Sequence, residues 1–377
     1  MSERGIRLTA SIMAGLVAGA APARADGAEL AAEVAPVLKA AFAFLERGQQ
    51  PDGGWVAFGG SDPAVTALVA RCFIQSPRYG PEHPIVQRAL RFVLRFAQED
   101  GGFYVEGRGL RNYQTSVCLM ALAATKDPRY RRQIEAAQRF LTTLQWDEAE
   151  GHEEDSAWYG GAGYGRHKRP DLSNTQMMIE ALHQSGLPAD HPAYRKAVRF
   201  ISRAQMLSQT NDQAFVGAGG DGGFIYTPAN GGESKAGTEV VEGRERLRSY
   251  GSMTYAGFKS LLHARVDRDD IRVRRAFEWI RQYYRLDANP NMPDVQSQEG
   301  LYYYYHVFAK ALAAWGEDEI VDAAGQRHDW RRELCRALRE RQKPDGSFVN
   351  SADRWMEGNP ALVTAYAVLA IQTAVQD

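Results

Sequence analysis

The chain has 377 residues, of which 44% are hydrophobic, and its 45 Lys and Arg residues nearly balance its 46 Asp and Glu residues. The resulting net charge of −1 gives no support for binding to nucleic acids or to anionic membrane surfaces. Its three cysteines, Cys72, Cys118 and Cys335, are too far apart for a C-x-x-C metal knuckle or a disulfide framework, so we expect buried free thiols.

The first 25 residues have the pattern of a secretory signal peptide. Arg4 and Arg7 give a basic start, residues 8–20 form an apolar run, and Ala23-Arg24-Ala25 is an A-x-A cleavage site. The run is shorter than the ~20 residues that a membrane span needs, and no later stretch is long and apolar enough. We therefore expect export to the periplasm or the medium, with a mature start at Asp26; the alternative is an ordinary first helix.

A Gly-rich turn recurs along the chain, each time between two helical stretches. Its copies are Asp52-Gly53-Gly54-Trp55, Asp100-Gly101-Gly102-Phe103, Asp221-Gly222-Gly223-Phe224 and Asp345-Gly346-Ser347-Phe348. A unit that cannot cover its own apolar face stacks on copies of itself, so the repetition predicts a repeat architecture.

Apolar residues at helical spacing predict two sets of helices. The first set has Arg and Lys between its apolar positions, mostly ends near a Gln, and covers 34–50, 85–98, 131–145, 194–205, 273–284 and 330–342. The second set is apolar nearly all round, as in helices buried between other helices, and covers 65–74, 115–124, 175–184, 254–264, 306–315 and 363–373. Asp62-Pro63 and Asn359-Pro360 are start signals of this second set.

Six helix pairs can form an open solenoid or a closed ring. Apolar second helices and charged first helices favour an inner ring surrounded by an outer ring. We therefore predict an all-α fold, an α/α toroid of about six helical hairpins, over residues 26–377 as a single domain.

The repeat resembles two known families. The Gln…Gly-x-(Trp/Phe) pattern of 44–55, 92–103 and 338–348 is similar to the QW-type repeat of squalene–hopene cyclases, and the alternation of helices resembles the β-subunits of protein prenyltransferases. Both families are α/α toroids, and the resemblance extends over nearly all of the mature chain. The chain also resembles exported proteins described only as "prenyltransferase and squalene oxidase repeat", and this resemblance implies a fold more firmly than an activity.

The motifs that carry these families' chemistry are incomplete here. Hopene cyclases protonate an alkene with an acid from a D-x-D-D-T-A signature, but Ala64 and Val65 replace two of its carboxylates in 62–67. The segment 171–175 keeps one carboxylate as well, and Asp62 before a proline is best explained as a helix cap. Prenyltransferases hold zinc with a D-x-C pair, which is missing, and His306 alone is a weak ligand. We expect no metal and no cofactor.

Polar and aromatic residues gather where the second helices begin, which would place them on one rim of a central cavity. The predicted catalytic residues are Asp155, Glu299, His306 and Glu357. The predicted substrate-binding residues are Trp158, Tyr164, Asp171, Tyr250, Tyr255, Tyr303, Tyr304, Arg354 and Trp355. Aromatic walls with a few polar groups are typical of small-molecule pockets, although four consecutive tyrosines on one helix point in different directions.

Three functions stay open at this point. The resemblance implies a protein that binds or transforms an isoprenoid-like apolar ligand in the cavity. Export and a rim of tyrosines and carboxylates suggest a carbohydrate-active toroid, a lyase or hydrolase, with Asp155 and Glu357 as paired acids and Tyr250 or His306 as base. The incomplete motifs also allow a non-catalytic interaction scaffold. The expected partner is a small-molecule or glycan ligand in the central cavity, and the sequence does not define an oligomeric state.

Overall fold

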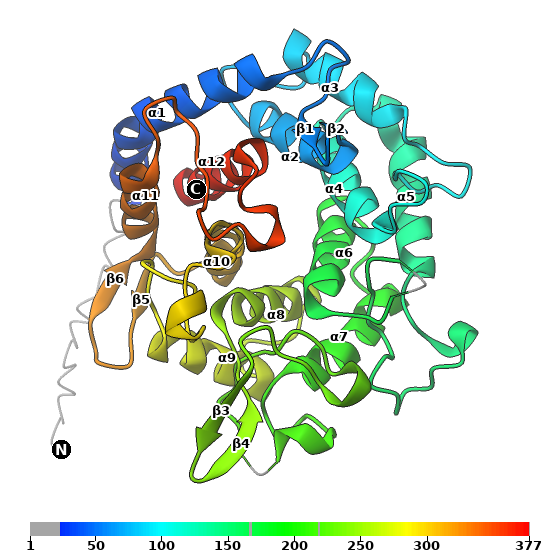
Figure 1. The fold of residues 1–377 in the computed structure, drawn as a ribbon, viewed down its shortest axis with the longest axis vertical. Coiled ribbons are helices and arrows are strands. Elements are labelled where there is room, and N and C mark those ends of the chain that lie inside the picture. The colour runs from blue at the N-terminus through cyan, green and yellow to red at the C-terminus, as the bar shows by residue number, and fades with distance from the viewer. Residues whose placement is uncertain (1–22, 166–167, 218, 377) are drawn as a thin grey trace, which may run out of the picture.

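Helices that alternate along the chain form two concentric rings in the computed structural model (Figure 1). The structure describes residues 23–165, 168–217 and 219–376. The predicted signal sequence lies outside these residues except for its end, from Ala23 to Ala25, which begins the first helix. The predicted α/α toroid is confirmed.

Both predicted sets of helices are present, with ends close to those expected. The outer helices are α1 (Ala23–Gly48), α3 (Pro84–Leu94), α5 (Arg131–Thr143), α7 (Pro192–Ala204), α9 (Ile271–Gln282) and α11 (Trp330–Arg341). The inner helices are α2 (Pro63–Ile74), α4 (Arg111–Ala124), α6 (Leu172–Gln184), α8 (Gly251–His263), α10 (Leu301–Trp315) and α12 (Pro360–Val375). Helix α1 begins earlier than predicted and continues through Pro36, with Leu30 and Val34 buried in the core.

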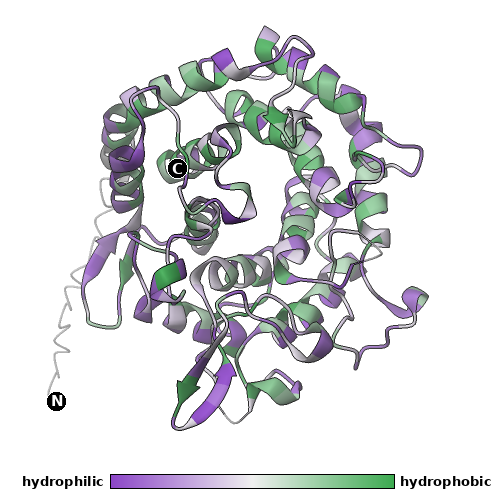
Figure 2. Cartoon of the chain, in the orientation of Figure 1, coloured by the Kyte–Doolittle hydropathy of each residue, from purple (hydrophilic) through white to green (hydrophobic). Residues whose placement is uncertain are grey.

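The inner ring is closed. Each inner helix packs on the next one in the chain, and α12 packs back on α2. In the outer ring α1 packs on α11 and α12, so the first and last hairpins adjoin. Figure 2 shows the expected difference in hydropathy, with inner helices mostly hydrophobic and outer helices mixed. The arrangement is a closed toroid and not an open solenoid.

The Gly-rich turns hold five of the six inner helices at the same height. In the first turn the Asp52 carboxylate accepts a hydrogen bond from the Gly54 amide, and the Thr66 hydroxyl on α2 accepts one from the Trp55 amide at 2.9 Å. The same amide-to-threonine bond recurs at Phe103–Thr115, Ala162–Thr175, Phe224–Thr254 and Phe348–Thr364. One repeated contact therefore sets the register of five of the six inner helices.

Glutamines at the ends of four outer helices, α1, α5, α7 and α11, join their hairpin to the next one around the ring. The Gln342 side-chain amide donates to the carbonyl of Gly346 at 3.1 Å and to that of Val37 on α1 at 2.9 Å, which closes the ring. Gly346 has φ +90°, and a Cβ there would lie 2.3 Å from the Ala40 carbonyl oxygen, so the contact requires glycine. In the first hairpin Gln49 makes this link, to the carbonyls of Gly53 and Ile85.

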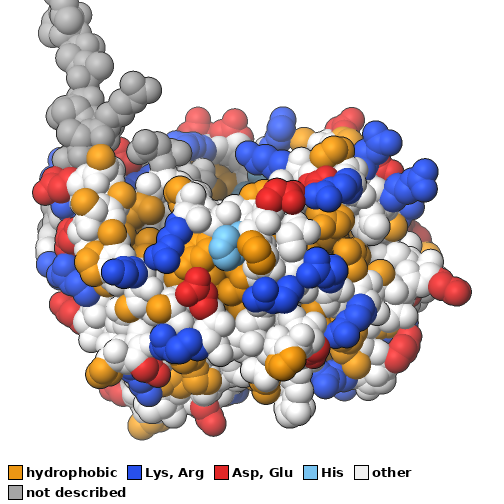
Figure 3. Space-filling model, turned by 90° about the horizontal axis from the view of Figure 1, so that it is seen from above, with side chains coloured by type: hydrophobic (Ala, Val, Ile, Leu, Met, Phe, Trp, Pro, Cys, Tyr) orange, Lys and Arg blue, Asp and Glu red, His pale blue; other side chains and the backbone are white. Residues whose placement is uncertain are grey.

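Three short antiparallel hairpins extend from the loops. They are β1 (Val56–Ala57) with β2 (Gly60–Ser61), β3 (Thr238–Val241) with β4 (Arg244–Leu247), and β5 (Glu319–Val321) with β6 (Arg327–Asp329). Acidic and basic side chains are interspersed on the face seen in Figure 3. The three cysteines are buried and unpaired, as predicted. None of the helices in the described part of the chain has the length and apolar character to cross a bilayer.

Candidate functional site

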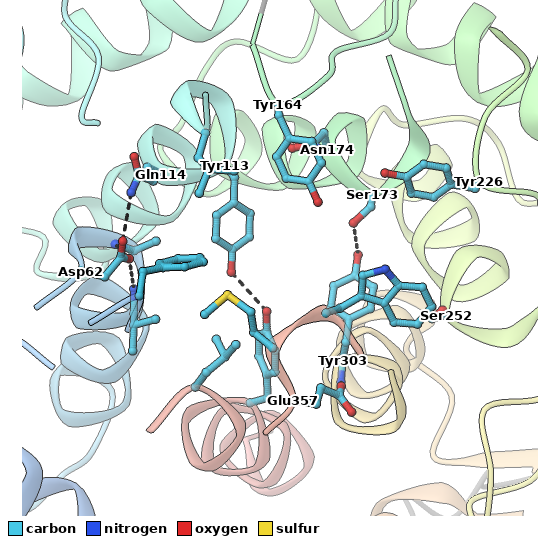
Figure 4. Close-up of a pocket in the computed structure, with 18 of the residues that line it drawn as sticks. Asp62, Tyr113, Gln114, Tyr164, Ser173, Asn174, Tyr226, Ser252, Tyr303 and Glu357 are labelled. Atoms are coloured by element: carbon cyan, nitrogen blue, oxygen red, sulfur yellow. Dashed lines mark hydrogen bonds between the residues drawn. The ribbon is translucent and has the colours of Figure 1, made fainter. Parts of the chain in front are cut away.

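A cavity of about 260 Å³ opens where the inner helices begin. Figure 4 shows side chains from several of these helices converging on it. Every inner helix contributes a lining residue from its first turn: Ala64, Tyr113, Ser173, Ser252, Tyr303 and Leu362. Because the turns hold the helices in a common register, residues far apart in the chain form one wall.

The wall of the cavity is largely aromatic. It includes Phe58, Tyr113, Tyr164, Tyr226, Tyr250, Tyr303, Trp355 and Tyr366. The hydroxyls of Tyr113 and Tyr366 lie 3.2 Å apart, and that of Tyr303 lies 3.2 Å from the Ser173 hydroxyl. Burial raises the pKa of Tyr113, Tyr303 and Tyr366, so these phenols are neutral at physiological pH and act as hydrogen-bond donors and acceptors.

Asp62 is a buried carboxylate in this wall, and both of its oxygens are engaged. Oδ1 accepts from the amides of Ala64 and Val65 at 2.9 and 3.1 Å, which makes Asp62 the N-cap of α2, as predicted. Oδ2 accepts from the Arg108 guanidinium at 3.0 Å and from the Gln114 amide at 3.1 Å. Asp62 therefore accepts four N–H hydrogen bonds, two on each oxygen, and joins the start of α2 to Arg108 and Gln114.

Glu357 is the second carboxylate in the wall and the one predicted catalytic residue that lines the cavity. Its oxygens accept from the Tyr303 amide and from the Asn350 side-chain amide, both at 2.7 Å. It therefore caps α10, whose own N-cap position is Gly300 and has no side-chain cap. Burial raises the pKa of Glu357 to about 7, so near neutral pH it is partly protonated.

The loop before Glu357 is strained at the cavity. Trp355 and Met356 both line the cavity and both have left-handed backbone conformations, with φ 59° and 68°. A left-handed backbone conformation costs free energy in a non-glycine residue, and such residues are concentrated at functional sites. Arg354 lies outside the lining, where its guanidinium packs 4.4 Å from the Trp355 ring centre and pairs with Glu299.

Asp171 lies behind the aromatic wall and does not itself line the cavity. It is the N-cap of α6 and accepts from the amide and the side chain of Asn174 at 2.8 and 2.9 Å. Burial raises its pKa to about 6, although hydrogen bonds from Asn174 and Tyr226 oppose the rise. Two predicted substrate-binding residues, Tyr164 and Tyr250, do line the cavity beside it.

The structure places the other predicted residues away from the cavity. Asp155 is exposed in the loop before α6, and Glu299 is in the ion pair with Arg354, so neither lines the cavity. Trp158 stacks on His152 with ring centres 5.0 Å apart and donates to Asn230. The predicted acid pair Asp155 and Glu357 is therefore not assembled in the cavity.

Three further predicted residues lie within the helical wall. His306 is buried with its ring centre 5.2 Å from that of Tyr366, and the Tyr304 hydroxyl donates to the Arg285 carbonyl at 2.8 Å. Tyr255 packs on Tyr304, with ring centres 5.4 Å apart. An inner helix is buried on all sides and presents one narrow face to the axis, so of the tyrosines at 302–305 Tyr303 is the one that lines the cavity.

Several lining residues were missed from the sequence, among them Tyr113, Gln114, Ser173, Ser252, Tyr226 and Tyr366. A usable signal was present. In five of the inner helices the lining residue is two positions before the threonine that anchors the turn, namely at Ala64, Tyr113, Ser173, Ser252 and Leu362. The position two residues before that threonine therefore predicts which side chain faces the axis better than the polarity of the side chain does.

Comparisons with known proteins agree with this geometry. Residues 60–230 match the family model of the squalene–hopene cyclase C-terminal domain. A type II terpene cyclase from Scytonema, in complex with geranylgeranyl dihydroxybenzoate, has a TM-score of 0.57 at 14% identity, covering 92% of this chain and 99% of that one. Over residues 60–230 this chain is therefore similar to squalene–hopene cyclases.

Other α/α toroids are also similar to this chain in fold. The cellobiose 2-epimerase from Spirochaeta thermophila has a TM-score of 0.55 at 14% identity, covering 93% of this chain and 97% of that one. A family 76 glycoside hydrolase from a bovine Bacteroides thetaiotaomicron strain has a TM-score of 0.51 at 12% identity, covering 89% of this chain and 77% of that one. No curated protein matches significantly in sequence. At these identities the likeness extends to the fold alone.

Proposed function

We propose that this protein is an exported binder of a compact, isoprenoid-like apolar ligand, which it holds in the cavity at the head of the inner ring. The observation that carries the proposal is the lining, in which eight aromatic rings and the aliphatic side chains of Val65, Met253 and Leu362 surround about 260 Å³. Apolar concave sites with few polar groups bind through the hydrophobic effect, and aromatic faces add shape and orientation.

Alkene protonation is not part of the proposal. Asp62 occupies the place of the family's acid motif but is held by four N–H donors. Glu357, with a pKa raised to about 7, is a weaker acid than an ordinary carboxyl group and is anchored to the start of α10. If the protein transforms its ligand, Glu357 is the group available for general acid–base chemistry.

A direct binding measurement tests the proposal. Farnesol and cellobiose are titrated separately into the purified protein, with native mass spectrometry and tryptophan fluorescence as readouts. Met253→Trp fills the cavity and should raise the Kd for farnesol about tenfold or more, since the added indole takes the ligand's volume. Val295→Trp is the matched control, because Val295 is 95% exposed and outside the lining.

A carbohydrate ligand is the second candidate, favoured by the six tyrosines and two carboxylates in the wall. Binding of cellobiose without farnesol, abolished by Met253→Trp, would replace the apolar ligand with a sugar. Failure of both ligands to bind would contradict a ligand site of either kind and favour the scaffold. Export is tested separately: the protein recovered from the periplasm or medium should begin at Asp26 by intact mass.

A further inference from the structure

Deeper along the axis, beyond the cavity, four inner helices bring charged side chains together. Glu180 on α6 forms ion pairs with Lys259 on α8 and Lys310 on α10, and Arg71 on α2 lies 4.0 Å from it. The Glu180 side chain is 1% exposed and that of Lys259 is 0% exposed. We call these four residues the axial charge cluster.

The axial charge cluster contains three basic side chains and one carboxylate. Within the residues that the structure describes, Glu180 is the one acid paired with any of them. The neighbouring His306 adds no further positive charge, because burial lowers the pKa of its imidazole well below the usual range. Nε of Arg71 and Nδ1 of His306 are also buried without a hydrogen-bond partner. Unmatched buried charge is costly, so this part of the axis favours the approach of an anion.

A chain of hydrogen bonds connects the cluster to the cavity. The Lys259 ammonium donates to Oε1 of Gln176 at 2.7 Å, which turns the amide nitrogen of Gln176 toward the Tyr303 hydroxyl at 2.9 Å. Because Tyr303 accepts from Gln176, its own proton is available to the Ser173 hydroxyl, 3.2 Å away, or to a ligand. Lys259 thus fixes Tyr303 as a donor at the wall of the cavity.

We propose that the cavity takes an apolar chain that ends in an anionic oxygen group, with that group at Ser173 and Tyr303, next to the axial charge cluster. This deepens the proposed function and rests on it. Two hydroxyl donors supply the hydrogen bonds, and the excess positive charge behind them favours a carboxylate or phosphate over a neutral alcohol. The same charge opposes a carbocation at this end of the cavity.

The test compares ligands that share one chain and differ in the head group: farnesol, farnesoic acid and farnesyl monophosphate. We expect the wild-type protein to bind an anionic form about tenfold more tightly than farnesol. The comparison of farnesoic acid with farnesyl monophosphate identifies which anionic head group fits. Equal binding of all three overturns the inference and leaves the proposed function intact, whereas failure of all three to bind removes the proposed function and the inference with it.

Lys310→Met isolates the contribution of the cluster. It removes one cation, and Glu180 keeps Lys259 and Arg71 as partners, so the fold should be retained. The preference for the anion over farnesol should fall to about threefold or less. Lys196→Met is the control for net charge: Lys196 pairs with Asp147 and Glu148 outside the cavity lining, and its loss should leave the preference unchanged. An unchanged preference in Lys310→Met contradicts the inference.

The pH dependence of the unmodified protein gives a second readout if the variant does not fold. Lys310 faces Glu180 from α6, Lys259 and His263 from α8, Arg71 and Cys72 from α2, and His306 on its own helix. Burial, with Arg71 and Lys259 close by, lowers its pKa to about 7. The preference for farnesoic acid should therefore be greatest near pH 6 and decline above pH 8. Glu357 in the cavity wall titrates in the same range, so the profile is measured in Glu357→Gln as well as in the unmodified protein. A flat profile in Glu357→Gln would overturn the role of Lys310.

Discussion

The repeated framework and the axis of the toroid follow opposite rules. In the framework the same contacts recur: an amide-to-threonine bond, an Asp-Gly turn and a glutamine that reaches the next outer helix. On the axis the residue changes from one helix to the next, from Ala64 through Tyr113 to Ser173 in the cavity wall. The repeated contacts hold the ring together, whereas the lining residues that differ from one helix to the next determine the chemical character of the cavity.

The axis and the surface of the toroid also differ in their ion pairs. Glu180 is buried on the axis among three cations, whereas Glu299 pairs with Arg354 near the surface with a side chain 20% exposed. A buried charge that loses its partner keeps its desolvation cost, and a partly exposed pair contributes little because water replaces it. The two sites should therefore respond very differently to the same substitution.

The largest effect is expected from Glu180→Gln. The substitution leaves three buried cations without a carboxylate, which should lower the free energy of unfolding by about 3–5 kcal/mol. Glu299→Gln, the matched control, should lower it by about 1 kcal/mol or less. Urea unfolding followed by circular dichroism measures both, and similar losses in the two variants would contradict the structural contrast.

A smaller, pH-dependent effect is expected at Glu357. Burial raises its pKa from 4.5 to about 7, so the folded state holds the proton more tightly than the unfolded state does. The stability that this proton contributes is complete below pH 4.5 and is lost as pH rises through 7, by up to ~3 kcal/mol.

Glu357→Gln should remove this pH-dependent contribution to the free energy of unfolding. Relative to wild type, the variant should gain stability steadily between pH 5 and pH 8, as measured by urea unfolding at several pH values. Glu299→Gln should follow the wild-type curve in parallel. A constant difference between Glu357→Gln and wild type across this range would show that Glu357 does not titrate there.

The smallest effect tests the framework. Gly346→Ala places a Cβ against the Ala40 carbonyl at the seam between the last and first hairpins, in a backbone conformation with φ +90°. A loss of about 1–3 kcal/mol in unfolding free energy is expected. Gly59→Ala, with φ +81° and open space around the added Cβ, should cost less because only the backbone strain remains. Equal losses at the two glycines would mean that the seam contact is unimportant.

Much of the fold was predictable because its determinants are local and repeated. Amphipathic spacing gave both sets of helices, and Asp62-Pro63 and Asn359-Pro360 gave two inner-helix starts that the structure confirms as N-caps. The beginning of α1 at Ala23 was not predicted, because residues 1–25 were interpreted as a signal peptide and the first helix was placed at 34–50. The site was less predictable: Glu357, Tyr164, Tyr250, Tyr303 and Trp355 line the cavity, but Asp155, Glu299 and Trp158 lie outside it.

The sequence by itself determined the alternation of outer and inner helices and the turns between them, because helix periodicity and Asp-Gly geometry act over a few residues. Only the tertiary structure decided which side of each inner helix faces the axis. A helix that is apolar all round carries no such information, and a rotation of about 100° per residue separates Tyr303 from Tyr304. Closure of the ring then brought Arg71, Glu180, Lys259 and Lys310 into contact, although they come from four hairpins.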